Sequence, residues 1–301
     1  MRRSRSRLDL DGAACLLTGA GQGIGLETAR ALHARGARVA LVDVDGDRAR
    51  AAASSFGDRA LAVQADVRDR DGMAAATAQV VDAFGGLEVV VANAGVTPAR
   101  GTLRRLDPDD FDRVLDINVT GVFNTVRPAI EPVIAAGGHM VVVASVAAIM
   151  PGPMGSPYMV SKAAAEQLGR ALRLELAAHG ASAGVAYFGV VETEMTAVTM
   201  DADPIAAALG DRMPWPLSRR ITAARAGRVI AAGVERRAPR TLAPRGWHAI
   251  TVGRGLVPAV VDDVVARDRS LLELVRRSDA GDAQGTSGSR SERDGATFGA
   301  A

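Results

Sequence analysis

The segment Thr18-Gly-Ala-Gly-Gln-Gly-Ile-Gly25 follows directly on an apolar run that begins at Ala13, and it leads directly into a helical pattern. Glycines at 19, 23 and 25 allow a tight turn, a close approach of the backbone to a pyrophosphate, and close packing of a helix on a strand. The first turn of the following helix would offer unpaired N–H groups to that anion. A strand, this glycine pattern and a helix in that order predict a dinucleotide-binding turn.

Short runs rich in Val, Leu and Ala alternate with longer helical patterns from Ala13 to Phe188. This alternation is typical of β–α–β units, which build a parallel sheet covered by helices on both faces. We therefore predict an α/β fold with a doubly wound parallel sheet of Rossmann type, in a single domain with a C-terminal helical extension. The expected strands are 13–18, 38–43, 60–65, 87–92, 139–145, 182–188 and 239–242.

The regions around this core have their own expected boundaries. Residues 1–9 form a basic arm that we expect to be flexible. The main domain spans 10–257 and includes a substrate lid at about 193–220, where methionines stand among prolines. A pattern of valines and leucines over 258–277 predicts an amphipathic helix that covers the substrate mouth or a subunit interface. Residues 278–301 are rich in Gly, Ser, Asp and Arg, so we expect a disordered tail.

Asp43 ends the expected second strand, 18 residues after Gly25. A carboxylate there would accept hydrogen bonds from ribose hydroxyls and repel a 2′-phosphate, which favours NAD over NADP. No arginine stands in the glycine turn to favour the phosphorylated cofactor. Arg38 and Arg48 are the nearby positions that would change this preference if folding brought either guanidinium to the phosphate. An ordinary turn residue is the alternative interpretation of Asp43.

Lys162 is the only lysine beside 35 arginines, and it lies four residues after Tyr158. A compact ammonium on a flexible stem is a property that the planar guanidinium of arginine cannot imitate. Residues four apart share a helix face, so this ammonium can favour the ionised form of the phenol. Tyr158 can then exchange a proton with a substrate oxygen near neutral pH. Ser145, at the end of a strand, can donate a hydrogen bond to the same oxygen.

The helix that carries Tyr158 is expected to begin at Ser156 and Pro157, with Ser as the N-cap and Pro in the first helical position. A leucine stripe recurs every fourth residue, at Leu168, Leu172 and Leu176. It predicts packing against the sheet or against a partner.

Together these features resemble a classical short-chain dehydrogenase/reductase over about residues 10–195. The resemblance implies four catalytic positions, at Asn118, Ser145, Tyr158 and Lys162, with Asn118 helping to hold a water that links Lys162 to solvent. Each of these residues alone also has a structural interpretation: Asn118 as a mid-helix amide, Ser145 as a strand-end hydroxyl, Tyr158 at the edge of the core, and Lys162 as a lysine that remains by chance on a helix surface. The implied cofactor-binding residues are Gly19, Gln22, Gly23, Ile24, Gly25, Asp43, Asp66, Val67, Asn93, Ala94, Gly95, Tyr158, Lys162 and Thr193.

Within this resemblance, Asp66 corresponds to the acidic residue on the adenine side, and Thr193 to the contact with the nicotinamide carboxamide. One position departs from the family pattern. Phe188-Gly189 stands where the family usually has Pro-Gly, and because proline fixes φ, its loss is expected to loosen the backbone near the nicotinamide.

The resemblance implies an NAD-dependent oxidoreductase that interconverts a secondary alcohol and a ketone, with Tyr158 as general acid/base. Two alternatives remain: a dinucleotide-binding sensor or scaffold without turnover, and an isomerase or dehydratase of the extended family. We expect an apolar small-molecule substrate, because several side chains can line a pliable apolar pocket, although they can equally fill gaps in the lid. These side chains are Met150, Met154, Met195, Met200, Met213 and Trp215.

Composition narrows the remaining possibilities. Cys15 is the only cysteine and the four histidines are scattered, so we expect no disulfide framework and no metal site. The net charge of +2 comes largely from the basic arm at 1–9, which could touch nucleic acid or an anionic membrane but is more often solvated, so we expect no nucleic-acid partner. No apolar stretch reaches the roughly 18 residues that would predict a transmembrane segment. Free cysteine and the lack of a signal peptide favour a cytoplasmic location. A homodimer or homotetramer is expected.

Overall fold

The computed structural model describes residues 7–99, 101–150, 152–202, 204–210, 218–244, 246–253 and 267–281. Its centre is a seven-stranded sheet in the order β3-β2-β1-β4-β5-β6-β9, and every neighbouring pair is parallel. The strands are β1 (Ala14–Thr18), β2 (Arg38–Asp43), β3 (Ala60–Gln64), β4 (Val89–Ala92), β5 (His139–Val143), β6 (Ser182–Phe188) and β9 (Arg240–Ala243). The predicted doubly wound parallel sheet is confirmed.

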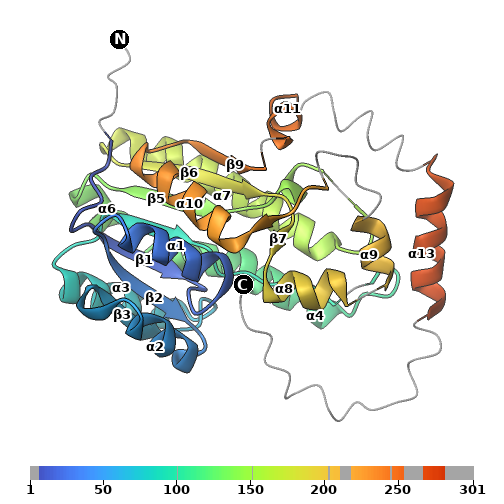
Figure 1. Cartoon of the computed structure of the whole chain (residues 1–301), viewed down its shortest axis with the longest axis horizontal. Coiled ribbons are helices and arrows are strands. Elements are labelled where there is room, and N and C mark those ends of the chain that lie inside the picture. Colours follow the sequence, from blue (N-terminus) through green and yellow to red (C-terminus); the bar gives the residue numbers. More distant parts are fainter. Residues whose placement is uncertain are drawn as a thin grey trace.

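Helices cover both faces of this sheet (Figure 1). They are α1 (Gly23–His33), α2 (Gly46–Ser54), α3 (Arg70–Phe84), α4 (Pro108–Leu115), α5 (Gly121–Val126), α6 (Ile130–Ala135), α7 (Ser156–Ala178), α8 (Glu194–Thr196), α9 (Pro204–Gly210), α10 (Ala223–Glu235), α11 (Trp247–Val252) and α13 (Arg269–Gly281). Shorter turns are η1 (Gly57–Arg59), η2 (Asp116–Thr120), η3 (Val146–Ala148) and η4 (Ala197–Asp201), of which η2 and η4 are π-helical. A second, two-stranded sheet pairs β7 (Val191–Glu192) with β8 (Ile221–Thr222).

Alternate residues of each strand enter separate cores on the two faces. Leu17 packs in the core that contains Leu32 of α1 and Ile230 of α10. The adjacent Leu16 packs in the opposite core, with Met73 of α3 and Leu172 of α7. Because both faces are covered, β1, β4, β5 and β6 consist entirely of buried residues.

The leucine stripe of α7 faces the sheet, as one of the two predicted arrangements required. Leu172 and Leu176 are buried and Leu168 is half-buried, all against the same core. The predicted helix start is wrong by one residue. Met159 N donates to Gly155 O at 3.1 Å, which makes Gly155 the N-cap and places Pro157 in the second helical position.

The two ends of the described chain differ from the expected boundaries. Leu8 is buried and its N–H donates to Glu235 O at 2.8 Å, so the predicted flexible arm (1–9) is held to α10 at its inner end. Residues 1–6 lie outside the described residues. Residues 258–266 of the predicted amphipathic helix and residues 282–301 of the predicted tail also lie outside them. Helix α13 ends at Gly281, beyond the expected boundary at 277.

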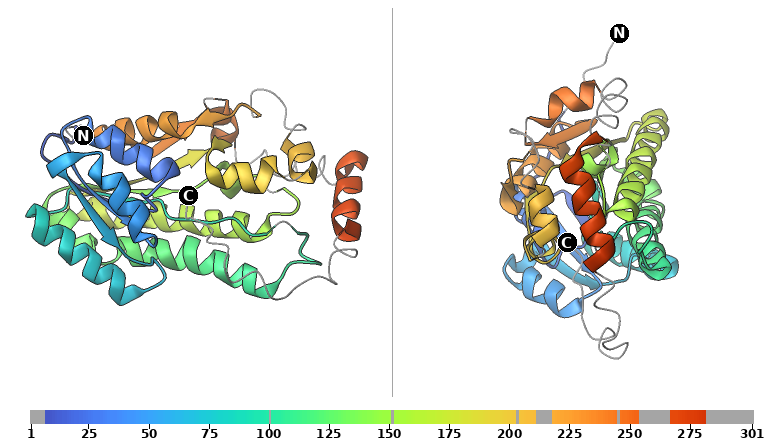
Figure 2. Two further views of the ribbon diagram at one scale, coloured as in Figure 1. Left: turned by 60° about the horizontal axis from the view of Figure 1, so that its bottom comes forward. Right: turned by 90° about the vertical axis from the view of Figure 1, so that its right-hand side faces the viewer.

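Helix α13 stands beside α9 at one end of the molecule in all the views (Figure 2). Asp279 accepts a hydrogen bond from Thr102 and lies 3.8 Å from the guanidinium of Arg104. Leu274 and Ser278 of α13 are buried. None of the helices in the described ranges combines the length and the hydropathy that a membrane crossing requires.

Candidate functional site

The glycine turn joins β1 to α1 at the point where the strand order reverses, between β1 and β4. Gly19 and Gly23 have φ values of +61° and +58°, in the left-handed region that favours glycine. A Cβ atom at Gly25 would lie 2.2 Å from the carbonyl oxygen of Gly19, so only glycine fits between turn and helix. No side chain caps α1 and its first turn holds no acid. Its N-terminal N–H groups therefore suit an anion such as a pyrophosphate.

Asp43 lies at the end of β2, beside this turn, and is 4% exposed. Its Oδ2 atom accepts from Gly21 N at 2.8 Å and its Oδ1 atom from Asp45 N at 3.1 Å. Burial raises the pKa of Asp43, while the two backbone N–H donors act in the opposite direction. The carboxylate is thus held in one orientation against the glycine turn.

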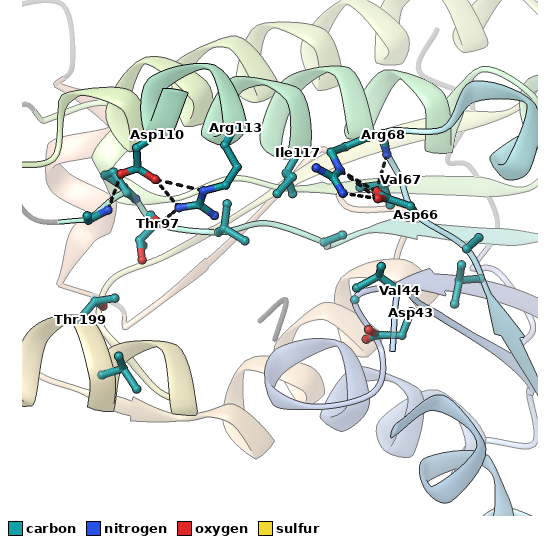
Figure 3. Close-up of a pocket in the computed structure, with 18 of the residues that line it drawn as sticks. Asp43, Val44, Asp66, Val67, Arg68, Thr97, Asp110, Arg113, Ile117 and Thr199 are labelled. Carbon is teal, nitrogen blue, oxygen red and sulfur yellow. Dashed lines mark hydrogen bonds and ion pairs between the residues drawn. The ribbon is translucent and has the colours of Figure 1, made fainter. Parts of the chain in front are cut away.

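A cavity of about 590 Å³ opens beside Asp43 at the carboxyl ends of β2, β3 and β4 (Figure 3). It brings together five of the residues predicted to bind a cofactor, although they lie far apart in sequence. At its other end the wall is formed by Thr97 with Asp110 and Arg113 of α4, and by Thr199 of η4. The five predicted residues are Gly19, Asp43, Asp66, Val67 and Ala94.

Asp66 is paired with an arginine that the sequence analysis overlooked. Arg68 donates from Nε and Nη2 to Asp66 Oδ2 at 2.9 and 2.6 Å, and from its backbone N to Oδ1 at 2.9 Å. Burial alone would raise the pKa of Asp66, but the hydrogen bonds and charge of Arg68 more than offset it and leave the pKa below its usual value. Arg68 also lines the cavity, so a guanidinium stands beside the predicted acid. The separation of two residues between Asp66 and Arg68 is the signal from which the sequence could have predicted this ion pair.

Asn93 is directed at the glycine turn. Its Nδ2 atom donates to Thr18 O at 3.0 Å and to Gly19 O at 3.1 Å. The Thr18 hydroxyl accepts in return from the backbone N atoms of Asn93 and Ala94. These bonds join the ends of β1 and β4, so Asn93 shapes the turn and Ala94 forms the cavity wall.

Tyr158 and Lys162 lie one turn apart on α7, with the Lys162 Nζ atom 5.5 Å from the centre of the Tyr158 ring. Lys162 is 5% exposed and donates to Val143 O at 3.2 Å. Burial lowers the pKa of Lys162 to about 8. A Cβ atom at Gly95 would lie 3.1 Å from Nζ, so the lysine depends on a glycine at that position.

Ser145 follows β5 as the N-cap of η3, and its side chain lies beside Tyr158. Its hydroxyl accepts from Ala147 N at 3.1 Å and donates to Phe188 O at 3.4 Å. Burial raises the pKa of Tyr158, and the Ser145 side chain opposes that shift. Three of the four predicted catalytic side chains are therefore neighbours, although Ser145 follows β5 and the other two lie on α7.

Asn118 lies in the π-helical turn η2 and is fully buried. Its amide accepts from Val96 N at 2.7 Å, and it donates to Val96 O at 2.8 Å and to the Ser161 hydroxyl at 2.9 Å. Gly95 separates it from Lys162, since a Cβ atom there would lie 3.1 Å from each side chain. The structure thus places Asn118 across Gly95 from Lys162, with its amide bound to Val96 in the loop after β4.

The backbone at Phe188-Gly189 is held despite the missing proline. Gly189 N donates to Ala243 O at 3.1 Å, which extends the β6–β9 pairing past the strand end. The indole Nε1 atom of Trp247 occupies the space beside Gly189, 2.8 Å from where a Cβ atom would stand. The neighbouring strand and Trp247 contact this segment, and the expected loosening stays a prediction.

Thr193 and Glu194 begin the segment that the sequence predicts to be a substrate lid, at about 193–220. Thr193 and Thr196 form a capping box at the start of α8. Glu194 then pairs with Arg48 of α2 at 3.1 Å. Arg38, by contrast, donates to Gly12 O and Phe84 O at the opposite end of β2. Of the two arginines singled out earlier, only Arg48 stands near Asp43.

The predicted apolar pocket receives limited support. Met150 packs with Tyr187 and Trp247, which fits gap filling in the core. Met154 is buried and has a φ of +64° in the loop between Ser145 and Tyr158. Met195 and Met200 are half-buried in the predicted lid, while residues 213 and 215 lie outside the described residues. Within the described ranges, no group of three or more His, Cys, Asp or Glu side chains is arranged to hold a metal.

Comparison with known proteins agrees with this fold. Residues 13–203 match the family described as short chain dehydrogenase. The chain is 34% identical to 2-(R)-hydroxypropyl-CoM dehydrogenase of Xanthobacter autotrophicus, over 62% of this chain and 77% of that protein. It is also 34% identical to 2,5-dichloro-2,5-cyclohexadiene-1,4-diol dehydrogenase of Sphingobium indicum, over 65% and 79%.

A solved structure shows the same architecture. The 3-ketoacyl-(acyl-carrier-protein) reductase of Brucella melitensis, complexed with NADH, superposes with a TM-score of 0.69 at 27% identity, covering 78% of this chain and 97% of that one. The chain therefore belongs to the short-chain dehydrogenase/reductase family. Its relatives are dehydrogenases of hydroxylated compounds, and the family binds a nicotinamide dinucleotide.

Proposed function

We propose that this protein is an NAD-dependent oxidoreductase that interconverts a secondary alcohol and a ketone, with Tyr158 as the general acid/base. The observation that carries the proposal is that Tyr158 and Lys162 of α7 lie together with Ser145, which follows β5. Lys162 Nζ lies 5.5 Å from the Tyr158 ring centre, and the Ser145 side chain lies beside Tyr158 and acts to lower its pKa. A sensor or scaffold has no need of this arrangement.

Proton transfer follows from these neighbours. Burial by itself makes the Tyr158 phenol a weaker acid, so the site needs positive charge to favour the phenolate. Lys162 supplies it, because a pKa of about 8 leaves the amine mostly protonated at neutral pH. Ser145 can donate to the substrate oxygen and hold it next to Tyr158. The nicotinamide, when bound, supplies the hydride exchange and a further positive charge in its oxidised form.

The glycine turn and the cavity fit the cofactor that this reaction requires. The N-terminal N–H groups of α1 would hold the pyrophosphate, and Asp43 would accept the ribose hydroxyls. Asp66, Val67 and Arg68 would form the adenine wall. A 2′-phosphate would meet the Asp43 carboxylate, so we infer a preference for NAD over NADP. Thr193, at the start of α8, would lie on the nicotinamide side.

We propose small-molecule alcohols and ketones as substrates, covered by a lid at about 193–220 and by α13. The named relatives are dehydrogenases of 2-(R)-hydroxypropyl-CoM and of 2,5-dichloro-2,5-cyclohexadiene-1,4-diol. These two compounds share a hydroxyl group and differ in the rest of the molecule, so only the hydroxyl group is proposed for the substrate of this protein. A homodimer or homotetramer is the proposed assembly.

A panel of secondary alcohols tests the proposal. NADH formation from NAD is followed for each alcohol with the unaltered protein and with Tyr158→Phe. We expect turnover with at least one alcohol in the unaltered protein and none in the variant, while both bind NADH. NADH binding without turnover on any alcohol or ketone would favour the sensor.

A further inference from the structure

Arg48 joins two parts of the chain that form opposite sides of the cofactor cavity. Its Nη1 atom donates to Gln22 Oε1 in the glycine turn and lies 3.1 Å from Glu194 Oε2 at the start of α8. Its Nε atom lies 3.3 Å from Asp45 Oδ2. Arg48 and Glu194 are 146 residues apart in sequence, so this contact exists only in the folded chain.

Arg48 and Glu194 both lie in the first turn of a capped helix. Asp45 caps α2 by accepting from Asp47 N and Arg48 N, which places Arg48 in the first turn of that helix. The Thr193 capping box orients α8, of which Glu194 is the first residue. A glutamate at a helix N-terminus is favoured by the helix dipole, so its carboxylate is stabilised where the guanidinium reaches it.

The pair lies at the rim of the cavity. Gly19 and Asp43 line the cavity on the side of the glycine turn, and Val198 and Thr199 of η4 line it on the other. Figure 3 shows Thr199 and Asp43 on separate elements that face the same space. Glu194 precedes Val198 by one helical turn, so a bond from Arg48 to Glu194 draws the η4 wall towards the turn that would hold the pyrophosphate.

An exposed ion pair of this kind contributes little to global stability. The side chains of Arg48 and Glu194 are 37% and 60% exposed, and such pairs are screened by salt. The same weakness allows the bond to open and close. Arg50–Asp47 gives the contrast: it has similar chemistry and lies on the same helix, but it connects two residues of α2 and crosses nothing.

We propose that Arg48 and Glu194 form a latch across the cofactor groove, and that Arg48 is a positioning residue that retains the bound dinucleotide by holding the segment Glu194–Asp201 closed. This role rests on the proposed function. It predicts that breaking the pair mobilises α8 and η4 and speeds cofactor release, with a smaller effect on association.

The test compares Glu194→Gln and Arg48→Gln with the matched control Arg50→Gln, each in the full-length protein. Hydrogen exchange of residues 194–201 is measured without cofactor, and NADH release is measured by stopped flow at low and high salt. We expect Glu194→Gln to speed both, with release about threefold faster, as suits an exposed pair. Arg50→Gln should match the unaltered protein. Adding Arg48→Gln to Glu194→Gln should not further speed the exchange of residues 194–201, because Glu194→Gln has already removed the bond that joins Arg48 to this segment.

High salt should accelerate release from the unaltered protein and have little effect on Glu194→Gln. Normal NADH binding with unchanged exchange and release in Glu194→Gln would overturn the latch and leave the proposed function intact. Failure of the unaltered protein to bind NADH or NADPH would overturn the proposed function, and the retention role with it.

Discussion

The Nζ atom of Lys162 lies 5.5 Å from the centre of the Tyr158 ring and donates to the carbonyl oxygen of Val143, the last residue of β5. The only ammonium side chain of the protein is therefore buried between the helix that carries the phenol and the strand that leads to Ser145. Helix α7 thus positions the charge, and the sheet holds it in place.

Tyr158→Phe should lower kcat by far more than tenfold while NADH affinity stays within about threefold, because only the transferable proton is lost. Tyr187, the other tyrosine, lies in β6 and is fully buried, and it serves as the control. Tyr187→Phe should keep most of kcat. Retention of more than about a tenth of kcat by Tyr158→Phe, a barrier change below about 1.4 kcal/mol, would remove Tyr158 from the mechanism.

Lys162→Met should change how stability depends on pH. Burial lowers the pKa of Lys162 to about 8 in the folded state, against 10.5 in the unfolded chain. Between these values the unfolded chain binds more protons, so this group adds stability as pH rises. Between about pH 8 and about pH 10, the unfolding free energy of the unaltered, cofactor-free protein should rise by roughly 2 kcal/mol more than that of the variant. Urea titrations at several pH values measure it, and parallel curves for the two proteins would show that Lys162 is not held in this environment.

Gly95→Ala should reduce kcat by more than tenfold. The added Cβ atom would lie 3.1 Å from both Lys162 Nζ and Asn118 Oδ1, so one of these groups must move. Gly86→Ala is the control, because its nearest neighbour would be 3.7 Å away. Equal kcat in both variants would show that the geometry around Lys162 tolerates displacement.

Asp43→Asn should weaken the preference for NAD. We expect the unaltered enzyme to favour NAD over NADP by at least about a hundredfold in kcat/KM, or roughly 2.7 kcal/mol. Asparagine keeps an acceptor for Gly21 N and removes the repulsion, so the ratio should fall at least about tenfold. Because Arg48 stands beside this position, adding Arg48→Gln should lower kcat/KM for NADP again. Comparable kcat/KM for both cofactors in the unaltered enzyme would show that Asp43 does not face the ribose.

Removal of α13 should raise the KM for the substrate or alter the oligomer, because Leu274 is buried and Asp279 is bonded to the loop after β4. A chain ending at Arg267 is compared with one ending at Gly281, which keeps the helix and should behave as the full-length protein. Steady-state kinetics and light scattering provide the readouts. Identical KM and mass in the two truncated proteins would exclude both roles for α13.

Local patterns were sufficient for the sheet and for the glycine turn. The predicted strands coincide with β1 to β6 and β9 to within about two residues, because buried parallel strands are continuous apolar runs that the chain itself displays. The requirement for glycine at 19, 23 and 25 is also local, since it arises from backbone conformation and from the packing of one helix on one strand. The i to i+4 spacing already placed Lys162 beside Tyr158.

Only the tertiary structure decided which residues of distant segments are in contact. Asn93 is turned to Thr18 and Gly19, and Trp247 occupies the space beside Gly189. Arg48 meets Glu194, and Asp279 meets Thr102, across separations of 146 and 177 residues. A side chain's partner over such distances depends on how the strands are ordered and how the covering helices dock, and periodicity along the chain carries no information about either.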